Sequence, residues 1–179
     1  MKATQPTLDW LYDPRVFQVN RLDACSDHAV YASVLEADTG ESSLTKSLNG
    51  LWKLRYAPDL EDQLEGFEAA DFDASGWADV PVPGCLELAG CGTPQYVNIQ
   101  YPWDGWEPIA PPQLPSKNPV AEYVTDFEMP ESFSGKRVVL SFDGAVTALY
   151  VWVNGVFIGY AEDSFTPSRF DLTDALLAG

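Results

Sequence analysis

The stretch "ALYVWVNGVFIGYAED", residues 148–163, decides the fold. Two runs of strand-forming residues, "LYVWV" and "VFIGY", flank the pair Asn154-Gly155. A two-residue type I′ turn needs a positive φ at both central positions, and Asn followed by Gly meets this need best. The stretch therefore predicts a β-hairpin. Its first run is apolar at every position, which is typical of a central strand that is covered on both faces.

Further strand-length runs lie on both sides of this hairpin. Strands at a spacing of about ten residues, without long helices between them, predict an all-β fold, an antiparallel β-sandwich. In one run Pro81 and Pro83 each remove a hydrogen-bond donor, which indicates an edge strand. The runs are "NGLWKLRYAP" (49–58), "WADVPVPG" (77–84), "EYVTDFEMP" (122–130), "KRVVLSFDG" (136–144) and "RFDLTDAL" (169–176).

The segment before these strands has a different character. Residues 1–47 show little hydrophobic periodicity and many turn-forming residues, which predicts an extended leader that lies over the core. We therefore expect a leader over 1–47 and a sandwich domain over 48–179. Leu60, Leu64 and Phe67 recur at positions i, i+4 and i+7, which predicts one short amphipathic helix in the domain.

The charge of the chain narrows its possible partners. Its 179 residues include 27 acidic and 10 basic ones, which makes the formal net charge −17. Such a surface repels phosphate groups, so we expect neither a nucleic-acid nor a membrane partner. Cys25, Cys85 and Cys91 are odd in number and have no metal-ligand spacing. Without a secretion signal, they indicate three free thiols in a cytoplasmic protein.

The residues that could carry chemistry do not form a recognisable catalytic or metal site. His28 is the only histidine, which argues against a His-rich metal site and a Ser-His-Asp triad. The segment "DFDASG" (71–76) starts like a calcium loop, but its twelfth position is Val82 instead of glutamate. The acidic residues cluster in loops, and no two of them stand out as a glycosidase pair. We expect no catalytic residue, metal ion or cofactor in this chain.

Aromatic and amide side chains gather in "PQYVNIQYPWDGWEPIAPPQLP", residues 94–115. Rings stack on the C–H faces of sugars while amides bond the hydroxyl groups, so the mixture suits a carbohydrate site. If residues 96–101 form a strand, Tyr96 and Asn98 face outward together and Tyr101 faces the core. Outward Asn98 either bonds a sugar diol or satisfies a turn of its own chain.

The second half of this stretch permits two interpretations. Trp103 and Trp106 bracket an Asp-Gly turn, so at least one ring is expected at a loop tip. That ring either stacks on a sugar or packs against another domain. The prolines between residues 107 and 119 predict a stiff, extended strap suited to lying across a surface.

Several motifs are specific when they are taken together: "LNGLWKLRYAP", "FDASGWADVPVPGCLE", "PQYVNIQYPW", "NPVAEYVTDFEMP" and "VVLSFDGAVTALYVWVNGVFIGYAEDSFTPSRFDLT". With them the chain, from about Asn20 onward, resembles the N-terminal part of the β-galactosidases of glycoside hydrolase family 2. The leader "VNRLDACSDHAVY", with Asn20 and Arg21, is more similar to that of β-galactosidases than to that of β-glucuronidases or β-mannosidases.

The resemblance implies a fold and a role. The fold would be a jelly-roll sandwich, galactose-binding-domain-like, which packs against an immunoglobulin-like domain and a (β/α)₈ barrel with two catalytic glutamates. Asn98 holds the place of an asparagine that contacts the galactosyl group in the barrel's active site. For the complete enzyme the resemblance implies magnesium, sodium, a β-galactoside substrate and a homo-oligomer.

The resemblance also implies that the chain is part of a longer one. It stops at Gly179, before an aspartate that binds sodium and substrate in that family, so we expect a C-terminally truncated domain that is inactive alone. An unpaired strand edge would then be open to self-association.

The function that the resemblance implies is that of a domain in a retaining β-galactosidase, which hydrolyses terminal β-D-galactosides such as lactose. Asn98 would contact the substrate, and Tyr96, Trp103 and Trp106 would form the rim of the site or a domain interface. Three alternatives stay open: a stand-alone carbohydrate-binding module, a purely structural domain, and a β-glucuronidase or β-mannosidase of the same family.

Overall fold

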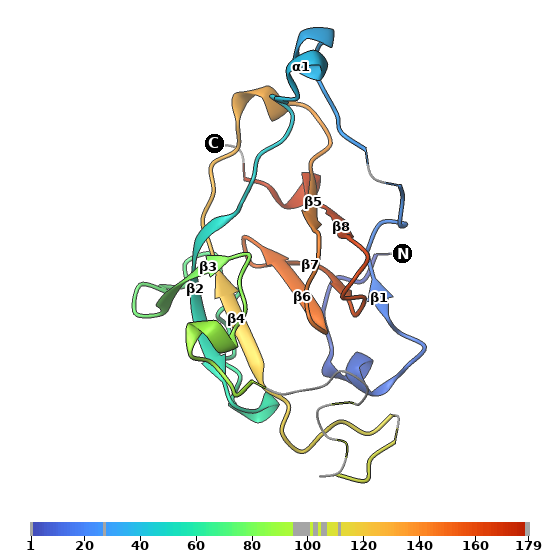
Figure 1. Ribbon diagram of the computed structural model, residues 1–179, viewed down its shortest axis with the longest axis vertical. Coiled ribbons are helices and arrows are strands. Elements are labelled where there is room, and N and C mark those ends of the chain that lie inside the picture. The colour runs from blue at the N-terminus through green and yellow to red at the C-terminus, as the bar shows by residue number, and fades with distance from the viewer. Residues whose placement is uncertain are drawn as a thin grey trace. The chain divides into compact units, whose positions relative to one another are not determined.

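The computed structural model of the chain describes residues 2–26, 28–94, 101, 104, 107–110 and 112–177. The chain divides into two compact units. Unit 1 combines Met1–Thr7, Val16–Leu48 and Phe127–Gly179, and unit 2 combines Leu8–Arg15 and Asn49–Asp126. Among the described residues, unit 1 contains two antiparallel sheets and unit 2 contains one (Figure 1).

Unit 1 is built around the predicted hairpin. Strands β6 (Leu149–Val153) and β7 (Val156–Ala161) are antiparallel neighbours, and β1 (Gln18–Val19) pairs with the other edge of β7. The turn residues Asn154 and Gly155 have φ values of 52° and 78°, so the predicted hairpin is confirmed. A second sheet pairs two further strands, β5 (Val139–Phe142) and β8 (Ser168–Asp171).

The two sheets of unit 1 share one apolar core. Val151 and Ile158 come from the first sheet and Phe170 from the second, and all three are buried. A Cβ atom on Gly159 would lie 2.5 Å from Cε1 of Phe170 and 2.7 Å from the carbonyl oxygen of Val19. Only glycine therefore lets the Phe170 ring lie directly on the backbone of β7.

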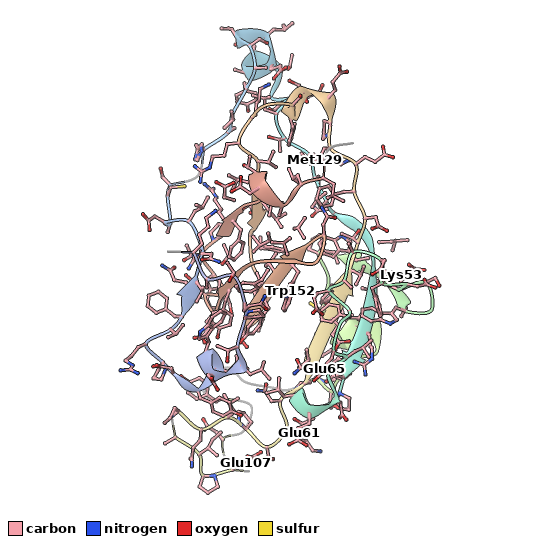
Figure 2. All side chains as sticks on the ribbon, turned by 180° about the vertical axis from the view of Figure 1, so that it is seen from behind. Lys53, Glu61, Glu65, Glu107, Met129 and Trp152 are labelled. Carbon is pink, nitrogen blue, oxygen red and sulfur yellow. The ribbon has the colours of Figure 1, made fainter. Side chains whose placement is uncertain are left out.

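Unit 2 contains a three-stranded sheet. Strand β2 (Gly50–Ala57) lies between β3 (Ala78–Val82) and β4 (Val120–Val124), antiparallel to both. Lys53 on β2, labelled in Figure 2, forms an ion pair across the ladder with Asp79 at 2.9 Å. In the described part of the chain β3 pairs only with β2, so the prediction of an edge strand there is confirmed.

The prediction of an amphipathic helix after β2 is wrong. Only one 3₁₀ turn forms there, η2 (Leu60–Asp62). Two side chains take backbone groups that a helix would use: Oε1 of Glu122 accepts the Leu64 N–H at 2.6 Å, and Nη2 of Arg55 donates to the last carbonyl of η2 at 2.9 Å. The Glu122 side chain is buried and also bonded to Arg55 at 2.7 Å. These tertiary contacts override a weak local pattern.

The described residues place an α-helix in the leader instead, α1 (Val34–Thr39). Ser33 caps it by accepting the Glu36 N–H at 3.2 Å, and Gly40 ends it with a φ of 75°. The sequence signal for this helix is S-x-x-E followed by glycine, which hydrophobic periodicity does not detect. Because the leader also contains the 3₁₀ turn η1 (Leu8–Tyr12), it is not extended throughout.

The prediction of an all-β fold built from antiparallel sheets is confirmed. The jelly-roll topology and the domain boundary at residue 48 stay predictions. None of the described helices is long and apolar enough to cross a bilayer. The remaining 3₁₀ turns are η3 (Glu87–Ala89), η4 (Glu131–Phe133) and η5 (Thr173–Ala175).

Candidate functional site

The predicted sugar-contact residues Tyr96, Asn98, Trp103 and Trp106 lie outside the described residues. Their contacts therefore stay predictions. Tyr101, from the same stretch, is 65% exposed, so the expectation that it faces the core is wrong. Its N–H donates to Oδ2 of Asp104 at 2.9 Å, and its carbonyl accepts the Asp104 N–H at 3.0 Å. Two hydrogen bonds thus join Tyr101 to Asp104, and Tyr101 itself is not part of a strand.

The proline-rich segment after Asp104 forms a closed loop. The Glu107 carboxylate, labelled in Figure 2, accepts the Ser116 N–H at 2.9 Å and the Ser116 hydroxyl at 2.7 Å. These hydrogen bonds lower the pKa of Glu107. Inside the loop Ala110 and Gln113 are joined by two hydrogen bonds. The prediction of a stiff, extended strap is therefore wrong, because the Glu107 carboxylate binds Ser116 and so brings the two ends of the segment together.

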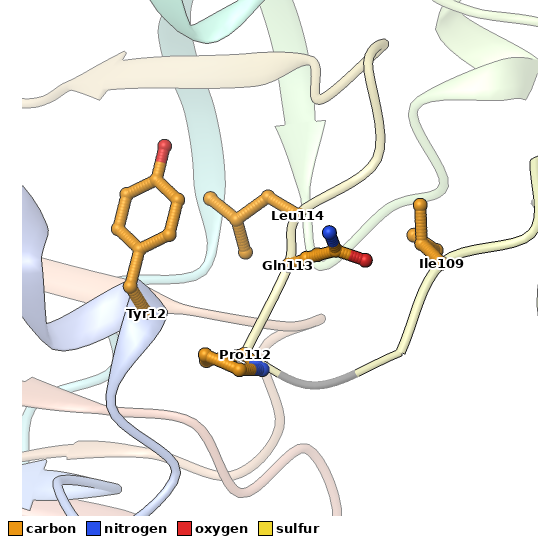
Figure 3. A pocket seen from close by; sticks show the side chains of 5 residues that line it. All are labelled: Tyr12, Ile109, Pro112, Gln113 and Leu114. Carbon is orange, nitrogen blue, oxygen red and sulfur yellow. The ribbon is translucent and has the colours of Figure 1, made fainter.

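A hollow of about 380 Å³ lies between this loop and η1, and both belong to unit 2. Figure 3 shows the Tyr12 ring on one side and the side chains of the loop on the other. Its lining residues are Tyr12, Ile109, Pro112, Gln113 and Leu114.

The described lining of the hollow has the chemistry to hold a sugar ring. An exposed Tyr12 ring offers an apolar face, and the Gln113 side-chain amide offers a hydrogen-bond donor and an acceptor. Among its described lining residues, the only ionisable side chain is that of Tyr12. The combination of a ring and an amide is the one that the sequence predicts for a sugar site. The position of the hollow was missed, because Tyr12 is distant in sequence from the loop.

The carboxyl groups of the described residues whose pKa departs from its ordinary value are all lowered. In each case hydrogen bonds hold the charged form, and for Asp13, Asp163 and Asp171 they bring the pKa to about 2. A glycosidase acid needs the opposite, a carboxyl group whose pKa is raised so that it keeps its proton near neutral pH. These carboxylates serve turns and strand ends. The others in the set are Glu36, Asp73 and Glu107.

Metal ligands are equally sparse in the part of the chain that the structure describes. It contains no group of three or more His, Cys, Asp or Glu side chains that could hold a metal ion. Magnesium and sodium prefer clusters of oxygen ligands. The described residues therefore do not fit either ion, and no step of the mechanism is assigned to a metal here.

Two leader residues organise unit 1 in a way that sequence reasoning missed. The Asn20 side chain exchanges hydrogen bonds with the backbone of Ala3 at 3.0 and 2.8 Å, and it donates to the carbonyl of Ile158 at 3.1 Å. Its neighbour Arg21 donates to the carbonyls of Thr166 and Pro167 at 3.4 and 3.2 Å. The leader is thus held to β7 and to the start of β8 by side chains, which have no periodic signal.

Comparison with known proteins supplies the remaining evidence. A family model described as "Glycosyl hydrolases family 2, sugar binding domain" matches residues 45–179. The chain is 53% identical over 175 residues to a β-galactosidase of Lactobacillus delbrueckii subsp. bulgaricus, which covers 98% of this chain and 17% of the relative. For a β-galactosidase of Streptococcus thermophilus the identity is 47% over 180 residues, with 100% and 18% covered.

A third relative is the β-galactosidase large subunit of Leuconostoc lactis. It is 44% identical over 182 residues, an alignment that covers 94% of this chain and 29% of the subunit. The chain therefore spans less than a third of the length of each of these relatives.

Proposed function

Because the chain belongs to glycosyl hydrolase family 2, with the sugar-binding domain of that family over residues 45–179, we propose that it is the N-terminal domain of a retaining β-galactosidase. The substrates would be terminal β-D-galactosides such as lactose. The observation that carries this proposal is the 53% identity over 98% of the chain to a protein named β-galactosidase. The complete enzyme would be a cytoplasmic homo-oligomer whose magnesium and sodium ligands lie outside the described residues.

In a retaining mechanism two carboxyl groups share the work. One protonates the glycosidic oxygen, and the other attacks the anomeric carbon to form a galactosyl-enzyme, which water then hydrolyses with help from the first. We place both groups in a barrel outside this chain. The chain itself would bind and orient the galactose, since the Asn98 amide can donate to one hydroxyl and accept from another.

The test is Asn98→Ala in the complete enzyme. Loss of a buried hydrogen bond that strengthens toward the transition state costs about 1–3 kcal/mol, so kcat/KM for lactose should fall by roughly 5- to 150-fold. Asn118→Ala is the matched control, because it removes the same amide from the proline-rich loop. We expect the control to keep kcat/KM within about twofold of the parent.

Two outcomes would contradict the proposal. If Asn98→Ala lowers thermal stability but leaves kcat/KM unchanged, Asn98 serves only its own backbone and the domain is structural. If the complete enzyme prefers a β-glucuronide or β-mannoside over lactose, the proposed substrate class is wrong while the place of the domain stands.

A stand-alone carbohydrate-binding module is the second candidate. The hollow at Tyr12 favours it, because a ring beside an amide is a sugar-binding combination within the described residues. This function requires that the 179-residue chain binds a sugar without any other domain.

A further inference from the structure

We propose that the turn between β7 and β8, residues 163–167, docks this domain onto the rest of the enzyme by placing Phe165 in an apolar pocket there. The inference rests on the proposed function, since it needs the further domains of a longer chain. We call these five residues the Phe165 turn.

The first observation is the exposure of the ring. Phe165 is 94% exposed, more than any other large apolar side chain among the described residues. Burial of a phenylalanine side chain is favourable, and this ring gains almost none of that free energy within the described chain. Single exposed apolar residues are common, however, so exposure marks an interface only when the ring is also held in place.

The turn that carries the ring is ordered from within. Oδ1 of Asp163 accepts the N–H of Phe165 and the N–H of Thr166, both at 3.0 Å. A side-chain hydrogen bond from Thr166, followed by these two backbone hydrogen bonds, lowers the pKa of Asp163 to about 2. The carboxylate thus fixes the backbone on both sides of the Phe165 Cα.

A buried arginine holds the same turn from the leader. Arg21 has a side chain that is only 5% exposed, and its Nη2 donates to the carbonyls of Thr166 and Pro167 and lies 3.7 Å from Oδ2 of Asp163. In the described part of the chain its buried Nε has no hydrogen-bond partner. Burying a guanidinium and leaving one donor unsatisfied both cost free energy. Arg21 is therefore buried at a cost in free energy, and its hydrogen bonds hold a turn whose Phe165 side chain is almost fully exposed.

A second exposed aromatic lies at the same end of β7. The carbonyl of Phe17 accepts the Glu162 N–H at 3.0 Å, and the Phe17 side chain is 54% exposed. The loop between β7 and β8 runs beside β1 in Figure 1, as the pairing of Gln18 with Ala161 requires. The backbone of Phe17 is therefore bonded to the start of the short acidic segment, Glu162 and Asp163, that leads to Phe165.

These features match one kind of partner. An aromatic anchor on a pre-ordered turn loses little conformational entropy on binding, and such anchors carry much of the free energy of interfaces. The pocket that fits would be apolar, with hydrogen-bond donors or cations at its rim to meet the acidic segment. Since two of the relatives are more than five times as long as the aligned region, the chain beyond residues 1–179 is the occupant to which we commit.

The test compares Phe165→Ala with Leu88→Ala, a control at an unrelated position that is 89% exposed. Both variants are made in the complete enzyme and in the 179-residue chain. In the complete enzyme, the rate of limited proteolysis is measured in the segment that joins this domain to the rest. Cleavage of a transiently opened state follows its population. Phe165→Ala should raise the rate roughly ten- to hundredfold, as expected for the loss of an interface anchor, while Leu88→Ala and the conservative Phe165→Tyr should not.

Three results would overturn the inference. Unchanged proteolysis of the complete enzyme would show that Phe165 does not hold the domain. If Phe165→Ala destabilises the 179-residue chain in urea unfolding as much as it destabilises the complete enzyme, the ring stabilises the fold of this domain and not an interface. If the 179-residue chain is a dimer and Phe165→Ala converts it to a monomer, the turn makes contacts between copies of the chain instead. None of these results touches the effect of Asn98→Ala on kcat/KM, so the proposed function is tested separately.

Discussion

At the scale of single residues, Gly159 shows most directly how the core of unit 1 depends on sequence. It lies where the Phe170 ring crosses β7, and a Cβ atom there would lie only 2.5 Å from Cε1 of that ring. Gly76, by contrast, faces open space, and a Cβ atom on it would meet nothing within 4 Å. The two glycines therefore form a matched pair.

We predict that Gly159→Ala lowers the free energy of unfolding of the 179-residue chain by about 1–3 kcal/mol, because overpacking displaces Phe170. Gly76→Ala should leave it unchanged or raise it by up to about 1 kcal/mol, through lower entropy of the unfolded chain. Urea unfolding followed by tryptophan fluorescence measures both. Equal midpoints for the two variants would mean that Phe170 does not pack on β7 as described.

At the scale of elements, strand β8 ends in a network of hydrogen bonds around Asp171. The Thr173 hydroxyl donates to Oδ1 at 2.7 Å, and Nε of Arg137 donates to Oδ2 at 2.7 Å. These bonds, with Thr173 the largest cause, lower the pKa of Asp171 from 3.8 to about 2. A carboxyl group with a lowered pKa stabilises the fold above its unfolded pKa, and this contribution is lost as the pH falls through the folded value.

The predicted consequence is a loss of stability of the chain between about pH 4 and about pH 2, with a smaller slope in Asp171→Asn than in the parent. Asp174→Asn removes the same charge from an exposed position nearby, and its slope should match that of the parent. Urea midpoints measured at several pH values compare the three proteins. Identical slopes for parent and Asp171→Asn would contradict the role of this carboxylate.

An element could be predicted when its signal is local in the sequence, and not when side chains from other elements decide its conformation. The β6–β7 hairpin was predictable because the Asn154-Gly155 turn and its flanking strands are local signals. The segment after β2 was not, since the Glu122 carboxylate reaches it from β4, which is distant in sequence, and Arg55 on β2 takes a carbonyl of η2 with its side chain. Helix α1 has a local signal, but of capping and not of hydrophobic period.

The candidate site divides in the same way. The mixture of rings and amides in residues 94–115 is visible in the sequence, whereas the hydrogen bonds between Glu107 and Ser116 join residues nine apart and bring together the two ends of a segment that its prolines predict to be extended. The hollow at Tyr12 needs η1 to lie beside that loop. Neither contact leaves a pattern in composition or spacing.

At the scale of the whole molecule, the described residues include a hollow lined by a tyrosine ring and an amide, and carboxyl groups with a shifted pKa that are all held in the charged form. The described residues offer no metal cluster. The chain belongs to the sugar-binding domain of glycosyl hydrolase family 2, and it spans 17% of a relative named β-galactosidase. Under the proposed function, residues 94–115 would be half of a site that residues of a barrel complete.

The measurement that tests this claim most directly is a titration of the 179-residue chain with galactose and with lactose, followed by amide and indole NMR shifts. We predict a folded protein whose spectra stay unchanged up to sugar concentrations on the order of tens of millimolar, since half a site gives no measurable affinity. Saturable shifts that Asn98→Ala abolishes would contradict this prediction, and would make the chain a carbohydrate-binding module in its own right.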